Sequence, residues 1–229
     1  MKNTKYVLVL TAILFTASIG PYTFADDETA AKAGEQVGVE GQFVRLAENS
    51  EGYVIVGYRT ANESVNGEWM LLDVGMTLQE GVKTQIITRD HIKVVAPDGT
   101  IISMATQEEY EKAKGSIIVL EQRSTMDTDS INYFPASANI PCRMEFFVDP
   151  THPREGLAYD QFDLSSSNAC AGLLFFHIPG GIQYGNYNLD VHFAESIVKV
   201  PMKIMTKDEA KAFEEQWKAQ LKANRHKGK

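Results

Sequence analysis

The chain has 229 residues, of which 44% are hydrophobic and 10% aromatic, so its composition excludes an intrinsically disordered protein. Its formal net charge of −8 argues against a nucleic-acid partner, because such affinity depends on lysines and arginines that neutralise phosphates. We expect the acidity to serve solubility.

Residues 1–25 have the pattern of an export signal. A positively charged start precedes an apolar run at 7–19, and Thr23 and Ala25 supply the small side chains at the −3 and −1 positions of a cleavage site. We therefore expect cleavage between Ala25 and Asp26 and a periplasmic or secreted product without a transmembrane span. An uncleaved anchor is the alternative, although the apolar run is short for a membrane-spanning helix.

The region after the signal divides into a leader and a β-rich domain. Residues 26–35 are small and polar, which indicates a flexible leader. From 36 to 205 the dominant period of apolar residues is two, the period of a β-strand. Strands are expected at 53–60 and at 70–78. In the second of these, apolar side chains alternate with smaller or polar ones, so we expect one buried face.

The middle of the chain predicts short strands with one helix among them. Strands are expected within 86–95, at 100–104 and at 116–120. Between the strands, Thr106 and Glu109 have the spacing of a capping box, which predicts a short inserted helix.

Two stretches predict long loops. Residues 122–139 lack a sustained period, and residues 149–168 contain two prolines and a run of three serines. Long loops in compact domains are often functional, so we expect any binding surface to involve them.

The last third of the chain has the clearest strand pattern, with strands expected at 142–148, 173–178, 187–193 and 197–204. Residues 206–229 predict a C-terminal amphipathic helix and basic tail. The helix opens with a second capping box and carries an apolar stripe that we expect to pack against the sheet, formed by Ala210, Phe213, Trp217 and Leu221.

The tail at 218–229 has five lysines or arginines and no acid. Two interpretations of it remain open. It could make weak contact with an anionic surface such as lipid, cell-wall polymer or an acidic partner. It could equally be the frayed end of the helix.

Cys142 and Cys170 are the only cysteines. In an exported chain they would meet an oxidising compartment, so we predict a disulfide between them. The bond would close a loop of about 29 residues, a constraint of about 3.6 kcal/mol in the chain-entropy model. Two buried free thiols are the alternative.

Residues 185–191, with the sequence Gly-Asn-Tyr-Asn-Leu-Asp-Val, resemble the penultimate strand of immunoglobulin-like sandwiches. In that fold a tyrosine two residues before a core position hydrogen-bonds back to the preceding loop. The resemblance covers residues 171–205 and implies this corner role for Tyr187, two positions before Leu189. It departs from the family at Leu189, where the usual inter-sheet cysteine is absent.

The resemblance and the strand pattern together predict the fold class. We expect a mainly β protein, an antiparallel immunoglobulin-like β-sandwich with an inserted short helix and a C-terminal amphipathic helix. A barrel, or two smaller β domains, are the alternatives.

Motifs that carry catalytic chemistry are missing from the chain. No nucleophile elbow, phosphate loop, dinucleotide fingerprint or HExxH occurs, so we predict no catalytic residues and no cofactor. The histidines lack metal-ligand spacing and the methionines fall in the inward phase of strands, so we predict no metal site. Calcium at the acidic 149–168 loop, or copper, remains an alternative.

Three residues are candidates for ligand binding. Tyr184 lies in a glycine-rich loop that could present its ring to a glycan or peptide, while His152 and Asp160 lie in the 149–168 loop. A hydrolase would instead have to combine His91 or His152 with an acid and a serine, for which the available groups are Asp90, Asp160 and the serines at 165–167.

These observations favour an exported, non-enzymatic β-sandwich protein of a bacterial-type cell envelope. We expect it to bind or scaffold another envelope component, either a protein or a glycan. A periplasmic hydrolase, or a metal-binding module on the same fold, is the alternative.

Overall fold

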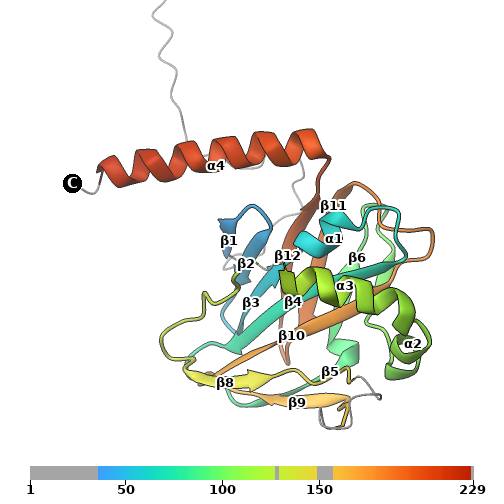
Figure 1. Ribbon diagram of the computed structural model, residues 1–229. Coiled ribbons are helices and arrows are strands. Elements are labelled where there is room, and N and C mark those ends of the chain that lie inside the picture. Colours follow the sequence, from blue (N-terminus) through green and yellow to red (C-terminus); the bar gives the residue numbers. More distant parts are fainter. Residues whose placement is uncertain (1–35, 127–128, 149–156, 228–229) are drawn as a thin grey trace, which may run out of the picture. The chain divides into compact units, whose positions relative to one another are not determined.

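The computed structural model of the protein describes residues 36–126, 129–148 and 157–227. These residues form a mainly β structure in which two sheets face each other, joined by a two-stranded ribbon and by helices (Figure 1). The predicted export signal at 1–25 and the leader at 26–35 lie outside the described residues.

The larger sheet has six strands among the described residues, in the order β1-β2-β3-β4-β10-β8. In this order, the strands are β1 (Gln36–Gly41), β2 (Val44–Glu48), β3 (Gly52–Gly57), β4 (Trp69–Leu78), β10 (Asn168–His177) and β8 (Ile140–Arg143). Neighbours pair antiparallel, except that β8 runs parallel to β10. The long connection between β8 and β10 allows this exception, because parallel strands need a crossover to return the chain.

The smaller sheet has the order β12-β11-β6-β7. Its strands are β12 (Ile197–Ile204), β11 (Gly185–His192), β6 (Ile92–Val95) and β7 (Ile101–Ser103), and all pair antiparallel. A separate ribbon pairs β5 (Gln85–Thr88) with β9 (Gln161–Leu164). A strand was expected near β5, but β9 lies within the stretch 149–168 that we had expected to be a loop.

The two sheets share one buried core. In β4 the side chains of Met70, Leu72, Val74 and Met76 are fully buried, as the alternating pattern predicted. Their counterparts in the smaller sheet come from every second residue of β12, where exposed and buried positions alternate along the whole strand. The core therefore fills the space between the sheets, as it does in a β-sandwich.

The outer face of β4 and β10 is covered as well. Leu71 and Phe175 on that face form a second buried cluster with Tyr110 of α2 (Gln107–Lys112) and with Ile117 and Leu120 of α3 (Lys114–Met126). In Figure 1 these two helices lie across β4 and β10. The strand pair is thus buried on both faces, which explains the unbroken apolar runs in its sequence.

The strand predicted at 116–120 was wrong, because these residues lie inside α3. A short apolar run does not by itself distinguish a strand from a buried helix. Here Ile117 and Leu120 are three residues apart, so a helix places both against the sheet, whereas a strand would separate them. The capping box that opens α2 is present as predicted, with Glu109 N–H donating to the Thr106 hydroxyl.

The C-terminal helix α4 (Lys207–Lys227) also begins at its predicted capping box, where the Glu209 carboxylate accepts from Thr206 N–H at 2.9 Å. Lys203 and Thr206 together lower the pKa of Glu209 to about 2. Of the predicted stripe, Ala210 and Phe213 pack against the core. Trp217 stacks on Phe213, and the side chain of Leu221 lies outside the described part of the structure.

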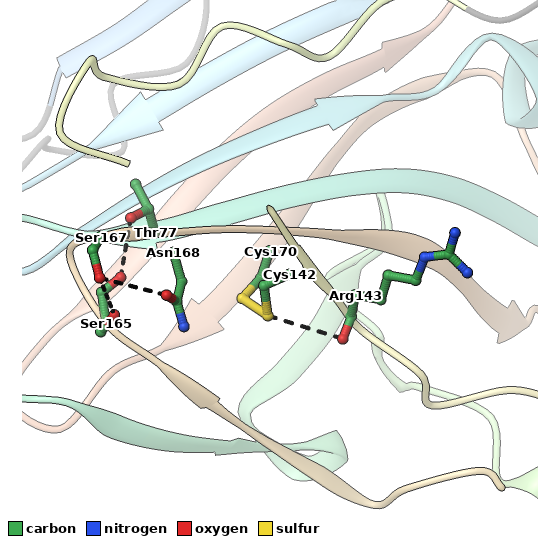
Figure 2. Close-up of a disulfide and its surroundings, with 7 residues drawn as sticks. All are labelled: Thr77, Cys142, Arg143, Ser165, Ser167, Asn168 and Cys170. Carbon is green, nitrogen blue, oxygen red and sulfur yellow. Dashed lines mark hydrogen bonds between the residues drawn. A yellow bond between two sulfur atoms is a disulfide. The ribbon is translucent and has the colours of Figure 1, made fainter. Parts of the chain in front are cut away.

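The predicted disulfide is confirmed (Figure 2). Cys142 of β8 and Cys170 of β10 are directly paired in the parallel register, with their Cα atoms 4.1 Å apart. The bond fastens an edge strand to the buried centre of the sheet. Cys170, Leu174 and Phe176 all lie in the same buried core, which confirms that these residues share one face of the strand as predicted.

We expect removal of this bond to destabilise the protein. Replacing both Cys142 and Cys170 with alanine should lower the free energy of unfolding by about 3.6 kcal/mol, the chain-entropy value for this loop. Urea denaturation of the double variant and of the reduced wild type measures the change. Equal stability of the oxidised and reduced proteins would contradict the prediction.

Glu51 joins the two sheets at one end. It lies between β2 and β3, and its buried carboxylate accepts from the Ser196 hydroxyl at 2.6 Å, from Gln85 at 2.7 Å and from Glu195 N–H at 3.1 Å. Burial alone would raise the pKa of Glu51, but these hydrogen bonds outweigh it and lower the pKa. The ionised carboxylate therefore stabilises the fold.

Glu51→Gln should lower the unfolding free energy at pH 7 by about 1–3 kcal/mol. Glutamine replaces one carboxylate oxygen, which accepts hydrogen bonds, with an NH2 group, which cannot accept from the donors that surround it. In the wild type, the stabilisation by the ionised Glu51 carboxylate is fully present at neutral pH. It is lost as the pH falls from the ordinary pKa of 4.5 through the lowered pKa of the folded state. Denaturation at pH 7 and pH 3 should show a smaller pH dependence in the variant. Glu195→Gln, on the exposed part of the same hairpin, is the matched control.

Candidate functional site

The outer face of the larger sheet carries two hollows of about 290 and 540 Å³. The first lies between the start of α1 (Arg59–Glu63) and the end of α3, and the second lies under residues 129–139. Both are lined by Asp73 and Asp129, so they form one surface, which we call the Asp73 groove. The combined size is within the usual range for ligand sites.

Glycines in the outer phase of β3 and β4 make room for the segment 129–139. A β-carbon at Gly75 would lie 2.7 Å from the ring of Phe134, and one at Gly57 would lie 3.1 Å from a methyl group of Ile131. The segment therefore rests directly on the sheet backbone. In β10, the side chains that line this part of the groove include those of two alanines, Ala169 and Ala171. Because alanine is small, these positions do not fill the hollow.

The segment 129–139 is held at several points. Its first residue, Asp129, makes a two-pronged ion pair with Arg59, at 2.8 and 3.0 Å, and the Arg59 guanidinium lies 4.7 Å from the ring centre of Phe43. Further along, the Tyr53 hydroxyl donates to the carbonyl of Tyr133. Burial raises the pKa of Tyr53 to about 12, so this hydroxyl keeps its proton.

Asp73 lies at the centre of the groove floor. Sheet register places it between Gly57 of β3 and Leu173 of β10, neither of which has a polar side chain. No hydrogen bond or ion pair reaches its half-buried carboxylate from the described residues, and burial raises the pKa of Asp73 to about 6. The groove thus contains a carboxylate whose hydrogen-bonding capacity is not used within the fold.

The structure does not bring the predicted binding residues together. Tyr184 is 53% exposed in the loop before β11, and it does not line the groove. Asp160 makes an ion pair with Arg89 at 2.8 Å, which gives it a structural partner. His152 lies outside the described residues.

Tyr187 has the contact expected of a corner tyrosine. Its ring is buried, and its hydroxyl accepts a hydrogen bond of 2.9 Å from the backbone N–H of Gln183 in the preceding loop. The contact holds the loop against the start of β11. The contact has the form that the resemblance implied for this position.

The groups considered for a hydrolase make separate local contacts. Nδ1 of His91 accepts from the N–H of Thr88 at 3.1 Å. The hydroxyls of Ser165 and Ser167 are 3.0 Å apart, and the carbonyl of Ser165 accepts from Thr77 (Figure 2). Among the described residues, no three His, Cys, Asp or Glu side chains are placed to hold a metal ion.

The sequence did contain a signal for the groove. Asp73, Gly75 and Thr77 occupy the phase opposite to the core-facing side chains of β4, so the alternation alone predicted a solvated face. Leu71 and Phe175 share that outer face, and their apolar side chains indicated a cover that we did not infer. An aspartate under such a cover is a candidate binding group.

Comparison of the chain with models of protein families, with curated proteins and with solved structures gives no match in any of the three. Within the described residues, no helix is both long enough and apolar enough to cross a membrane. The function is therefore argued from the groove and the disulfide.

Asp73→Asn should stabilise the protein at neutral pH. Because the pKa of Asp73 is raised in the folded state, ionisation of this carboxylate disfavours folding by up to about 3 kcal/mol above pH 6. The penalty shrinks as the pH falls through 6 towards the ordinary value of 3.8. The variant should therefore exceed the wild type in urea denaturation at pH 7.5 and match it near pH 4. Asp163→Asn, on exposed β9, is the control and should show no such pH-dependent gain.

Proposed function

We propose that the protein is exported and that, without catalysing a reaction, it binds another component of a bacterial-type cell envelope in the Asp73 groove. The observation that carries the proposal is the groove itself, whose floor of small residues holds a carboxylate with no hydrogen-bond or ion-pair partner among the residues that the structure describes. Natural folds rarely retain such a group at a stability cost unless it serves binding or catalysis. The local contacts of His91, Ser165 and Ser167 favour binding over hydrolysis.

The disulfide supports the exported location. Cys142–Cys170 bonds of this structural kind persist in oxidising compartments and are rare in the cytosol. Together with the signal-like pattern at 1–25, this favours a periplasmic or secreted protein with a mature start at Asp26.

We also infer an immunoglobulin-like relationship for the sandwich. In that fold the second and fifth strands are neighbours in one sheet, and the third, sixth and seventh strands form the other. The neighbours β4 and β10, and the order β12-β11-β6, fit this arrangement if β3 is taken as the first strand and β5, β7 and β9 are treated as additions to the basic fold. The Tyr187–Gln183 hydrogen bond adds support, whereas the parallel β8 is a departure.

Site-specific cross-linking tests the proposed function. The full chain, expressed in a bacterial host, carries a photoreactive amino acid either at Asn132, exposed on the segment 129–139, or at Ser103, exposed on β7 of the other sheet. We expect an envelope component, identified by mass spectrometry, to be attached at Asn132 and not at Ser103. The same material should have Asp26 as its N-terminal residue.

Two results would contradict the proposal. Equal attachment at both positions would mean that the groove has no special role, and recovery of the protein only in the cytosol would remove the envelope location.

A further inference from the structure

The charges that line the Asp73 groove define what it can recognise. Among the described residues, those that line the two hollows and carry a charge are Arg59, Asp73 and Asp129. Arg59 and Asp129 neutralise each other through their two-pronged ion pair. The described part of the groove therefore presents the negative charge of one carboxylate, that of Asp73, and favours a ligand with a positive charge.

The surroundings of Asp73 suit a cation with an alkyl stem. Leu173, which is half-buried, lines the groove beside Asp73 and offers apolar surface to such a stem, whereas Leu71 lines the same hollow but is buried. A guanidinium has five N–H donors in a fixed plane and needs several acceptors, whereas an ammonium is a compact charge on a flexible stem. Ser124 and Thr125, which also line the groove, donate their hydroxyl protons to the Glu121 carbonyl, so towards a ligand their oxygens can only accept. A lysine fits these groups, because its ammonium can meet the Asp73 carboxylate while its alkyl stem lies against Leu173.

The groove continues on both sides of Asp73, which suits an extended chain. One hollow lies towards α1 and α3, and the other passes under the segment 129–139. Asn132 and Asn139 are among the residues that line the second hollow, and an asparagine side chain carries both donors and acceptors. These groups can pair with the N–H and C=O groups of a peptide backbone.

We propose that the Asp73 groove binds an extended peptide segment of an envelope protein, with the ammonium group of one lysine placed against the Asp73 carboxylate. This inference rests on the proposed function and adds the chemical class of the ligand. The proposal also predicts a pH dependence, because burial raises the pKa of Asp73 to about 6 and a cation binds its carboxylate more weakly once the carboxylate is protonated.

The test is an NMR titration of the ¹⁵N-labelled full chain. The probes are the peptide acetyl-Ala-Leu-Lys-Leu-Ala-amide and its counterpart with norleucine in place of lysine. At pH 7.5 we expect the lysine peptide to shift the amide signals of Gly57, Asp73 and Ile131, and to bind at least about tenfold more tightly than the norleucine peptide. At pH 5.0 only about a tenth of the Asp73 carboxylates are ionised, so the lysine peptide should bind about tenfold more weakly.

Variants separate charge recognition from a general loss of structure. Asp73→Asn should bind both peptides equally and with no pH dependence, while Asp163→Asn should behave as the wild type. Equal binding of the two peptides to the wild type, or no shift at millimolar concentration, would overturn the lysine proposal. Either result would leave the cross-linking result at Asn132 intact, so failure of the ligand class is distinguishable from failure of the proposed function.

Discussion

The pairing of β4 with β10 is the constraint on which the rest of the structure depends. Eight consecutive residue pairs join these strands, which are both interior strands of the larger sheet. One face of the pair fills the sandwich core, and the other is covered by α2, α3 and the segment 129–139. A pair buried on both faces leaves little room for polar groups, so each polar residue on it needs a physical reason.

Asp73 is the polar residue in which the effect of this constraint is clearest. On an open sheet, its carboxylate would be hydrated and would have its ordinary pKa. Between Gly57 and Leu173, beneath a covered face, it is partly dehydrated and holds its proton up to about pH 6. The raised pKa of Asp73 thus follows from the same arrangement that places helices over the outer face of β4 and β10 and small residues beside the carboxylate. Glu51 shows the opposite case, where hydrogen bonds from the β11–β12 hairpin and from Gln85 of β5 more than offset burial.

The β-rich fold, the two capping boxes and the disulfide could be predicted from the sequence, because each depends on local pattern or on a single pair of residues. The alternation in β12 is an example in which the buried positions follow from period alone. The helix at Ile117 and Leu120 could not be predicted, since only contact with Leu71 and Phe175 decides between strand and helix there. The groove was missed for the same reason, because the environment of Asp73 is created by segments far away in the chain.

The same strand pair has a consequence for how the protein folds. Strands β1 to β4 pair with their sequence neighbours and can form a meander early, but β10 reaches β4 only after the long intervening region has been made. Pairings of such high sequence separation slow folding, because loop-closure entropy is lost before the contact forms. Until then, the edge of β4 is an apolar template open to other chains. In a chain of this topology, the edge of β4 is therefore exposed to association with other chains until β10 has paired with it.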